Sequence, residues 1–416
     1  MSLDAYPRVS DWLRFDGDTL VVRTGKVDIG QRISTALAGI AHTELTLSLT
    51  AITVAPVRTG DSPDEGITSG SNSIEQSGHA IRMAAATLRE ALFDLAATRM
   101  GGEPGDWMLQ DGALTGPGTN RPIPLADLAA GMDLAFPVDP NAILRAAPDV
   151  AVPMLGMADL VTGRYQFVQD IDLPGMVHAR VVRPPHIRAR LDSISDKIAD
   201  RLLDEGLHIH RDASFLAVSG AGEWAVIKGA QRLANACTWD VGDGLPEDDI
   251  FAQLTTDNAA CYVVKDSTPV DEDIPAPLAN PSYKARYERP FAMHGALAPS
   301  AAVVVWDGTR LRITSHSQGI YPLRQSIAES LDLPLENVNV THGPGSGCYG
   351  HNGADDAAFE AALIAMARND TPVLLKWSRD DELAWEPYSP ASAVDVAAET
   401  DASGKIASFS AEAIGG

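Results

Sequence analysis

Two widely separated stretches of this chain repeat one apolar pattern, and this repeat constrains the fold more than any other feature. The stretch LTLSLTAITV at 45–54 matches LDLPLENVNV at 331–340 in the spacing of its apolar residues. Each stretch follows a helical pattern, and a loop that pairs glycine with glutamine precedes each helix, at 30–31 and at 318–319. The sequence therefore predicts two similar strand–helix–strand modules on either side of an inserted segment. Such units can also resemble one another by pattern alone, and that alternative stays open.

Apolar spacing predicts the elements of the two modules. Residues 19–24 and 51–57 are apolar enough for strands, and residues 33–45 between them repeat apolar side chains at helical spacing. A long helix follows, whose apolar face is formed by Ile81, Ala85, Leu88, Leu92 and Leu95. The later module is predicted to begin with strands at 301–306 and 311–315.

Length and composition place the chain among globular proteins of two to three domains. Of its 416 residues, 45% are hydrophobic and 21% are charged. The mixture of helix and strand patterns predicts the α+β class. Gly- and Pro-rich stretches divide the chain into five segments, which are 1–100, a connection at 101–154, 155–266, a linker at 267–282, and 283–416.

Charge and cysteine content exclude several classes of protein. The net charge of −24 argues against a nucleic-acid partner, which requires a basic surface, and against binding to an anionic membrane. Three unclustered cysteines provide neither a disulfide framework nor the four ligands of an iron–sulfur cluster. The first residues lack the charged and apolar regions of a signal peptide, and no apolar run is long enough for a membrane span. We therefore expect a cytoplasmic location, and periplasmic export together with a signal-bearing partner stays open.

Two loops that connect strands to helices are rich in small polar residues. Such loops expose N–H groups that suit phosphates and oxyanions. In the first, at 25–32, the amide of Gln31 can donate and accept hydrogen bonds beside Gly30. The second precedes the long helix and offers hydroxyl and amide groups through Gly70, Ser71, Asn72 and Ser73. An ordinary helix cap is the plain alternative for each loop.

A third loop, at 343–353, holds five glycines in eleven residues, which lets a backbone approach a large ligand closely. Its spacing matches neither a Walker loop nor a dinucleotide-fold fingerprint, and a flexible turn is the plain alternative. His342, Cys348 and His351 are of the types that bind zinc, but their spacing fits no common zinc site. The sequence places no base beside Cys348 that would make it a nucleophile.

Together these sequences resemble the molybdopterin-binding subunit of the xanthine dehydrogenase and aldehyde oxidase family, and within it the bacterial branch of nicotinate dehydrogenase and isoquinoline 1-oxidoreductase. GKVDIGQRISTALAGIAHTEL (25–45) resembles the glutamine loop of that branch, and DSPDEGITSGSNSIEQSGHAIR (61–82) resembles its Ser-rich pterin segment. DIDLPGMVHARVVRPP (170–185) resembles the aldehyde-oxidase a/b hammerhead domain. GSGCYGHNGADDAAFEAALIA (345–365) resembles the first cofactor domain.

The resemblance implies molybdenum-cofactor-binding domains that flank a hammerhead domain. Residues 1–100 would carry the glutamine and pterin loops, 155–266 the hammerhead, and 283–416 an incomplete first molybdopterin-binding domain. Gln31 would have the catalytic role of a hydrogen bond to the oxo ligand of molybdenum, and no residue is expected to ligate the metal. The implied cofactor-binding residues are Gly30, Gln31, Gly70, Ser71, Asn72, Ser73, Gly347, Cys348, Tyr349 and Gly350.

Three positions depart from the family pattern. Arg32 stands where the glutamine loop usually has a second glycine, and Cys348-Tyr349 stand where a phenylalanine is common between glycines. The His-x-x-x-Glu-Pro pattern of many relatives has Ala298 in place of the glutamate. We expect these departures to affect substrate preference more than the fold.

The resemblance also implies a molybdenum hydroxylase that oxidises N-heteroaromatic compounds or aldehydes with oxygen taken from water. The implied cofactor is molybdopterin, with the cytosine dinucleotide form as one option, and electrons would pass to iron–sulfur clusters on a small partner subunit. The sequence stops early relative to the family pattern, and no stretch matches the catalytic glutamate of the family. We therefore expect a second polypeptide to carry the missing C-terminal half, and no hydroxylation by this chain alone. A non-catalytic binding or scaffold fragment is the alternative.

Overall fold

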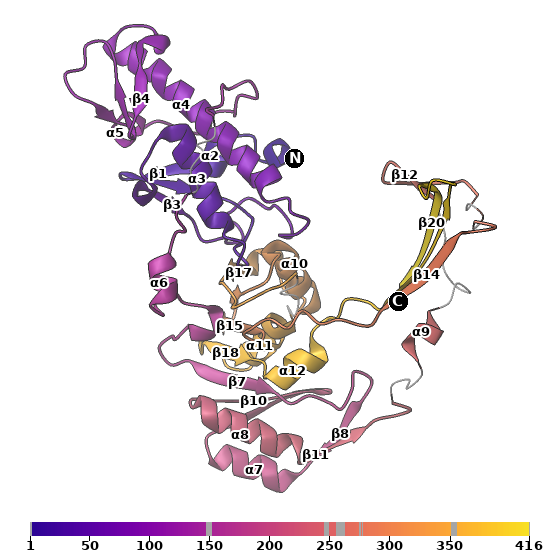
Figure 1. Cartoon of the computed structure of the whole chain (residues 1–416). Coiled ribbons are helices and arrows are strands. Elements are labelled where there is room, and N and C mark those ends of the chain that lie inside the picture. The colour runs from indigo at the N-terminus through magenta and orange to yellow at the C-terminus, as the bar shows by residue number, and fades with distance from the viewer. Residues whose placement is uncertain are drawn as a thin grey trace. The chain divides into compact units, whose positions relative to one another are not determined.

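The computed structural model describes residues 2–146, 152–244, 249–254, 263–273, 276, 278–350 and 356–415. The chain forms two compact units, each with its own packing. Unit 1 consists of Met1–Arg183, Leu191–Thr238 and Gly295–Ala384, and unit 2 of Pro184–Arg190, Trp239–His294 and Trp385–Gly416. Helices and strands are mixed along the chain, as the α+β class predicts (Figure 1).

The first module of unit 1 is a three-stranded sheet with two helices. Strands β1 and β2 are antiparallel, and β3 lies parallel to β2 after the crossover helix α3. Its elements are β1 (Leu13–Asp16), β2 (Thr19–Val22), α3 (Ile33–Leu45), β3 (Ile52–Val54), a π turn (Ile74–Gly78) and α4 (His79–Met100). The predicted strands and helices are confirmed here. Leu88 and Leu92 of α4 are fully buried against Leu37 and Leu45 of α3, because the apolar stripes of both helices face one core.

The second module has the same topology. Strands β15 and β16 form an antiparallel hairpin, helix α10 follows, and β17 lies parallel to β16. A short 3₁₀ turn precedes β3 at Leu49–Ala51, and another precedes β17 at Leu335–Asn337. Its elements are β15 (Ala301–Trp306), β16 (Leu311–Ser315), α10 (Ile320–Ser330), β17 (Val338–His342), α11 (Asp356–Met366) and β18 (Val373–Lys376). The repeat predicted from the apolar pattern is therefore present in the topology.

The segment between the modules extends the sheet of the second one. Strand β7 lies parallel to β18 and continues into β10 and β9, which gives a seven-stranded sheet of order β17-β16-β15-β18-β7-β10-β9. The new elements are β7 (Val177–Val181), β8 (Arg190–Ile194), α7 (Asp196–Asp204), β9 (His208–Asp212), β10 (Phe215–Gly220), α8 (Glu223–Ala234) and β11 (Cys237–Asp240). The predicted hammerhead at 155–266 thus shares a sheet with the following module, and the domain boundaries there stay a prediction.

Residues 101–146, which the sequence presents as a connection, contain regular structure. Three short strands form a sheet of order β4-β5-β6, and Leu109, Leu114, Leu125 and Leu128 join the core of the first module. The elements are β4 (Met108–Gln110), β5 (Ala113–Thr115), β6 (Ile123–Pro124) and α5 (Leu125–Ala129). These buried leucines make the segment part of the core. Its glycines and prolines led to the prediction of a connection instead.

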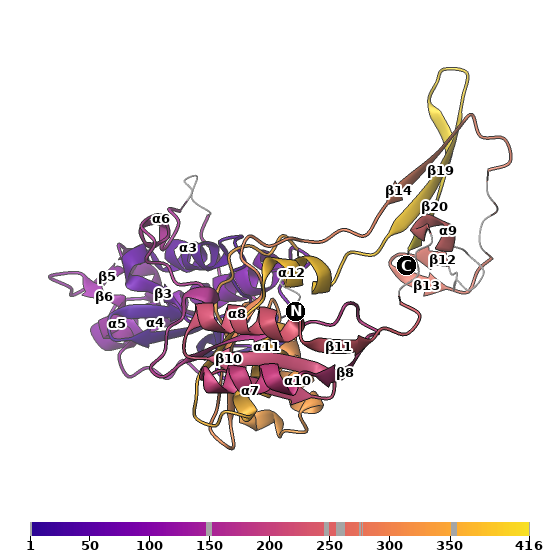
Figure 2. The same ribbon diagram turned by 90° about the horizontal axis from the view of Figure 1, so that it is seen from below.

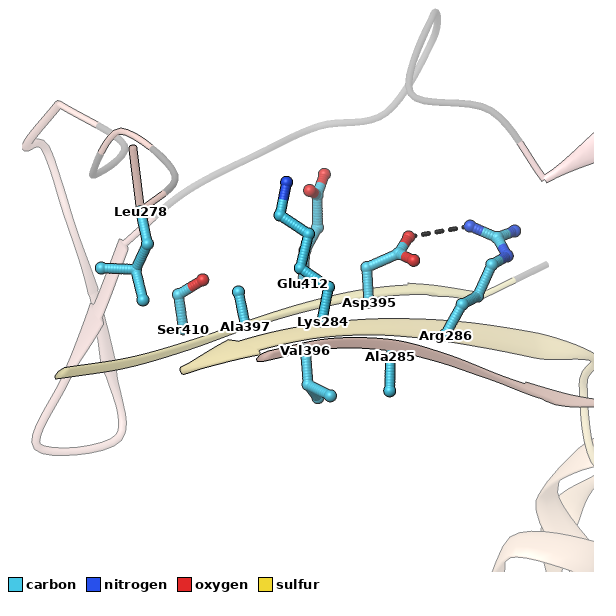
Figure 3. Close-up of a pocket in the computed structure, with 9 residues that line it drawn as sticks. All are labelled: Leu278, Lys284, Ala285, Arg286, Asp395, Val396, Ala397, Ser410 and Glu412. Carbon is cyan, nitrogen blue, oxygen red and sulfur yellow. Dashed lines mark hydrogen bonds and ion pairs between the residues drawn. The ribbon is translucent and has the colours of Figure 1, made fainter. Parts of the chain in front are cut away.

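Unit 2 is dominated by an antiparallel sheet of order β14-β19-β20 (Figure 2). The elements of unit 2 are α9 (Ile250–Gln253), β12 (Val263–Lys265), β13 (Thr268–Val270), β14 (Tyr283–Arg289), β19 (Ser392–Thr400) and β20 (Ile406–Gly415). One face of the sheet lines a groove of about 400 Å³, where Arg286 pairs with Asp395 at 2.8 Å beside Lys284, whereas Ala285 and Val396 point to the opposite face (Figure 3).

Short helices complete the chain, and they are α1 (Ser2–Ala5), α2 (Val9–Trp12), α6 (Met157–Val161) and α12 (Arg379–Trp385). Two 3₁₀ turns occur at Pro104–Asp106 and Val168–Asp170. Among the helices of the described residues, none combines the length and the apolar character that a bilayer crossing requires.

Candidate cofactor-binding site

Four loops of unit 1 follow parallel strands and meet at one place. Strands β2 and β3 are parallel, as are β16 and β17, so the loops after each pair leave the same edge of its sheet. These loops are 23–32, 55–73, 316–319 and 343–350. Ligands of open α/β sheets commonly bind outside the carboxyl ends of such strands. The predicted glutamine loop, Ser-rich loop and glycine-rich loop are three of the four.

A backbone connection joins the two modules. After β3, Arg58 forms an antiparallel bridge with Thr341 of β17. The Thr59 N–H donates to the Val340 carbonyl at 2.9 Å, and the His342 N–H donates to the Val57 carbonyl at 2.8 Å. The chain after β3 therefore acts as a further strand on β17, which fixes the start of the Ser-rich loop against the second module.

Thr68 is the point at which three of the loops meet. Its N–H donates to the Gln318 carbonyl at 2.8 Å, and the Gln318 amide Nε2 donates back to the Thr68 carbonyl at 2.8 Å. The Thr68 hydroxyl oxygen accepts from the N–H of Val27 at 3.0 Å, in the glutamine loop. Gln318 is 5% exposed, so these bonds are shielded from water. The glutamine of the second module thus positions the Ser-rich loop.

A buried lysine and a glutamate fasten the glutamine loop to the Ser-rich loop. The ammonium of Lys26, 3% exposed, donates to the Glu65 carbonyl at 2.8 Å. The Glu65 carboxylate accepts from the N–H of Gly25 at 2.8 Å and from the Ser77 hydroxyl at 2.6 Å. Burial lowers the pKa of Lys26, and the nearby Glu65 carboxylate opposes part of that shift. The sequence offered no signal for this pair beyond its position in the two loops.

Gln31 closes its own loop. Its Oε1 accepts from the N–H of Ile29 at 2.7 Å, and its Nε2 donates to the Val27 carbonyl at 2.9 Å. Gly30 (φ 102°) and Arg32 (φ 64°) both have left-handed backbone conformations in this tight turn. A side-chain amide carries two N–H groups, and the loop uses one of them. Gln31 is exposed, so the second N–H is accessible to a ligand.

The predicted phosphate loop presents polar groups that no described residue binds. Gly70 (φ 66°) and Ser71 (φ 60°) turn the chain with left-handed conformations, and both are exposed. Asn72 and Ser73 are partly exposed and lead directly into the π turn and α4. Among the described residues, none hydrogen-bonds to the side chains of Ser71, Asn72 or Ser73. Unpaired hydroxyl and amide groups beside the first N–H groups of a helix suit an anionic ligand.

The glycine-rich loop packs against the segment before β15. The Ser346 carbonyl accepts from the N–H of Ala298 at 3.0 Å, and a Cβ on Gly347 (φ 104°) would lie 3.0 Å from the Leu297 nitrogen. Cys348 is 1% exposed, whereas Tyr349 is 65% exposed. Of the cofactor-binding residues predicted in this loop, Tyr349 and Gly350 are therefore exposed to a ligand. The Cys348 side chain, which was also predicted to bind the cofactor, lies in the interior.

Residues 351–355 of this loop lie outside the described residues, and His351 is among them. The three-residue zinc alternative therefore falls partly outside the structure. Among the described residues, no group of three or more histidine, cysteine or acidic side chains could hold a metal ion.

His342 lies between the two modules. From the sequence, zinc binding was the only role weighed for it. Its Nε2 lies 3.1 Å from the Asp28 carbonyl, and its Nδ1 lies 3.1 Å from the Ser317 carbonyl. Burial lowers the pKa of His342, although hydrogen bonding to these two carbonyls works in the opposite direction. The ring therefore joins the glutamine loop to the loop after β16.

Comparison with known proteins finds molybdopterin-binding relatives of this chain. Two family models, both described as molybdopterin cofactor-binding domain, match residues 11–145 and 271–415. A subunit of nicotinate dehydrogenase from Pseudomonas putida is 29% identical over 404 residues, which cover 92% of this chain and 33% of that protein. These matches confirm that the chain resembles the molybdopterin-binding subunits of the xanthine dehydrogenase and aldehyde oxidase family.

A further sequence relative and a solved structure are also similar to this chain. The membrane-bound aldehyde dehydrogenase of Gluconacetobacter polyoxogenes is 23% identical over 96% of this chain and 54% of its own length. The aldehyde oxidoreductase structure from Desulfovibrio desulfuricans covers 70% of this chain and 38% of its own, with a TM-score of 0.50 and 14% identity, which speaks for the fold alone. The chain therefore spans between about a third and about half of the length of these two curated relatives.

The residues of the four loops fit a phosphate-bearing pterin. The Ser-rich loop offers unpaired donors at Ser71, Asn72 and Ser73 without any acidic side chain among them. The ammonium of Lys26 is already bound to backbone carbonyls, whereas the side chains of Ser71, Asn72 and Ser73 keep their donors available to an anion. Neutral hydrogen-bond donors suit a phosphate that also approaches a helix N-terminus.

Proposed function

We propose that this chain supplies the molybdopterin-binding part of an oxidoreductase that oxidises a small N-heteroaromatic compound or an aldehyde. The meeting of three loops at Thr68 is the observation that carries the proposal, because it holds the predicted glutamine and Ser-rich loops of the first module against Gln318 of the second. The names of the relatives, a nicotinate dehydrogenase and an aldehyde dehydrogenase, support the two substrate classes. When bound, the cofactor would supply the two-electron redox chemistry.

The chain's own residues have binding and orienting roles in this proposal. Ser71, Asn72 and Ser73 hold the phosphate, with the first N–H groups of the helix that follows them. Gln31 directs its remaining N–H toward the cofactor, and its other contacts keep the amide in one orientation. Tyr349, exposed beside Gly350, covers part of the bound cofactor.

Partners and the exact cofactor form are also part of the proposal. Electrons leave through iron–sulfur clusters on a small partner subunit, and the pterin is in the cytosine dinucleotide form. Because the chain spans only part of the length of its relatives, we propose turnover for the assembly that contains the remaining polypeptide.

Cofactor retention tests the proposal. The chain is produced in a host that makes molybdenum cofactor, and its molybdenum and pterin contents are measured by elemental analysis and by pterin fluorescence after oxidation. The wild type is expected to hold both, and a Ser71→Ala/Ser73→Ala variant is expected to hold about tenfold less, since two phosphate contacts are lost. Ser193→Ala, on the exposed face of β8, is the matched control. A chain that retains neither component, even beside its partners, would favour the scaffold alternative.

A further inference from the structure

A groove on unit 1 gathers three arginines in a chain whose net charge is −24. The groove has a volume of about 500 Å³ and is lined by Arg58, Arg310, Arg312, Ile313, Thr314, Asn339 and Thr341. Apart from Ile313, these side chains can all donate hydrogen bonds, and none is acidic. Small-molecule sites commonly have volumes in the range of roughly 300–1,000 Å³.

The strand register explains why these side chains share one surface. In the parallel pair, Arg312 lies opposite Asn339 and Thr314 lies opposite Thr341. The neighbours of Arg312 and Thr314 along β16 are buried, so the alternating residues face outward together. Arg58 extends the same row, because it bridges Thr341 from the segment after β3.

The charges in the groove are only partly balanced. Arg312 pairs with Asp307 at 2.7 Å, with side chains 54% and 27% exposed. The Arg58 Nε donates to the Thr341 hydroxyl at 3.3 Å, which leaves its two terminal nitrogens available. Among the described residues, none binds the guanidinium of Arg310. Three guanidinium groups against one carboxylate give a locally positive surface, although the chain has 56 acidic and 32 basic residues.

We infer that this groove binds a phosphate group of a small molecule. A guanidinium presents two parallel N–H groups that match the oxygens of a phosphate, and a doubly charged anion offsets the repulsion between neighbouring arginines. Thr314, Asn339 and Thr341 supply further donors along the same row. A single carboxylate has one charge and two oxygens, and it would leave most of these donors unused.

Ser71, Asn72 and Ser73 do not line the groove, which adjoins the candidate site through Arg58 and β17. Thr341 faces the groove, and the next residue, His342, contacts the Asp28 carbonyl in the glutamine loop. The phosphate can therefore belong either to the nucleotide of an extended cofactor or to a separate phosphorylated molecule. The first source rests on the proposed function, and the second does not.

Binding of phosphate compounds to the cofactor-free chain tests the inference. All titrations use the Ser71→Ala/Ser73→Ala background, which removes two of the hydroxyl donors of the Ser-rich loop. Orthophosphate, pyrophosphate and cytidine monophosphate are titrated by calorimetry at constant ionic strength, with acetate as the carboxylate probe. Saturable binding of at least one phosphate compound, tighter than binding of acetate, is the expected result.

Variants locate the bound phosphate. Arg310→Gln/Arg312→Gln is expected to weaken binding by about tenfold or more, since charge-assisted hydrogen bonds are lost. Arg121→Gln, on the exposed loop between β5 and β6, is the matched control and is expected to bind like its parent. Thermal unfolding of each variant establishes that the fold is retained, and Arg310→Gln alone provides a milder change.

The outcomes distinguish the two sources of the phosphate, and they separate a failure of this inference from a failure of the proposed function. Tighter binding of cytidine monophosphate than of orthophosphate assigns the groove to the nucleotide of the cofactor, and the reverse order assigns it to a separate ligand. Equal affinity in the arginine variants and their parent, or acetate binding as tight as phosphate, overturns the inference. If the wild-type chain retains no cofactor even beside its partners, while a phosphate compound still binds this groove, the proposed function fails and the groove remains assigned.

Discussion

Thr68 and Gln318 exchange two hydrogen bonds across 250 residues of sequence, each at 2.8 Å. One module contributes the Ser-rich loop and the other contributes the glutamine that holds it. Because Gln318 is buried, the loop cannot exchange these bonds for water without opening the contact between the modules. The site is therefore a product of both modules, and neither contains it alone.

Replacement of Gln318 by alanine should loosen the Ser-rich loop. The Thr68 carbonyl would lose its buried donor, which costs about 1–3 kcal/mol of unfolding free energy. Urea unfolding and pterin content are the measurements, and both are expected to fall. Gln325→Ala, on the exposed side of α10, is the control and should change neither. Wild-type stability in the Gln318→Ala chain would contradict the role of this contact.

Replacement of Gln31 by alanine should affect function more than stability. Gln31 is exposed and its hydrogen bonds lie within one loop, so the loss of unfolding free energy should be about 1 kcal/mol or less. Molybdenum content and turnover of the complete assembly should both fall, because the loop loses the amide offered to the cofactor. Gln110→Ala on β4 is the control. Unchanged turnover together with unchanged molybdenum content would rule out the proposed role of Gln31.

The elements of the modules were predictable because their apolar periodicity extends over many residues. Helix α3 at 33–45 and the strands at 301–306 and 311–315 have the predicted positions. The small sheet within 101–146 was not predicted, since strands of two or three residues are too short for a period to be recognised. Its leucines are assigned to the core only by their contacts in three dimensions.

The candidate site was predictable in its loops and not in the contacts that hold them. Small polar residues collect where strands end, which marked the loops of Gln31 and of the Ser-rich segment, and the family resemblance implied their roles. Lys26, Glu65 and Gln318 were missed as positioning residues, since their partners lie far away in the sequence or on another loop. A buried polar side chain is recognised by what it contacts, and local pattern contains no such information.

An ion pair between Arg183 and α11 should contribute strongly to stability. Arg183 forms a two-pronged contact with Glu360 of α11, and the Trp377 Nε1 donates to the same carboxylate at 2.8 Å. Arg183→Ala would leave Glu360 buried without its cation, a loss of about 3–5 kcal/mol in unfolding free energy. An Arg183→Met/Glu360→Leu double variant should recover most of that loss, and Arg121→Ala should lose little. Equal stability of Arg183→Ala and the wild type in urea unfolding would show that the pair is dispensable.

Burial of His316, which directly follows β16, should make the fold sensitive to mild acid. Burial lowers the pKa of His316 from 6.5 to about 4, and its Nε2 accepts from the N–H of Ala301, which requires the neutral ring. The unfolded chain binds the proton more readily than the folded chain, so the contribution of His316 to stability is complete above pH 6.5 and is lost as the pH falls toward 4.

The slope follows from linkage, at about 1.4 kcal/mol for each pH unit within that window. His316→Gln keeps an acceptor for the Ala301 N–H and cannot be protonated there. Urea unfolding of both chains at several pH values between 7 and 4 gives the difference between their unfolding free energies. The carboxylates titrate in both chains, so their contribution cancels in this difference. The wild type should lose stability relative to His316→Gln as the pH falls. A constant difference across the range would mean that His316 binds protons equally well in the folded and unfolded chains, and that its burial does not govern the acid response.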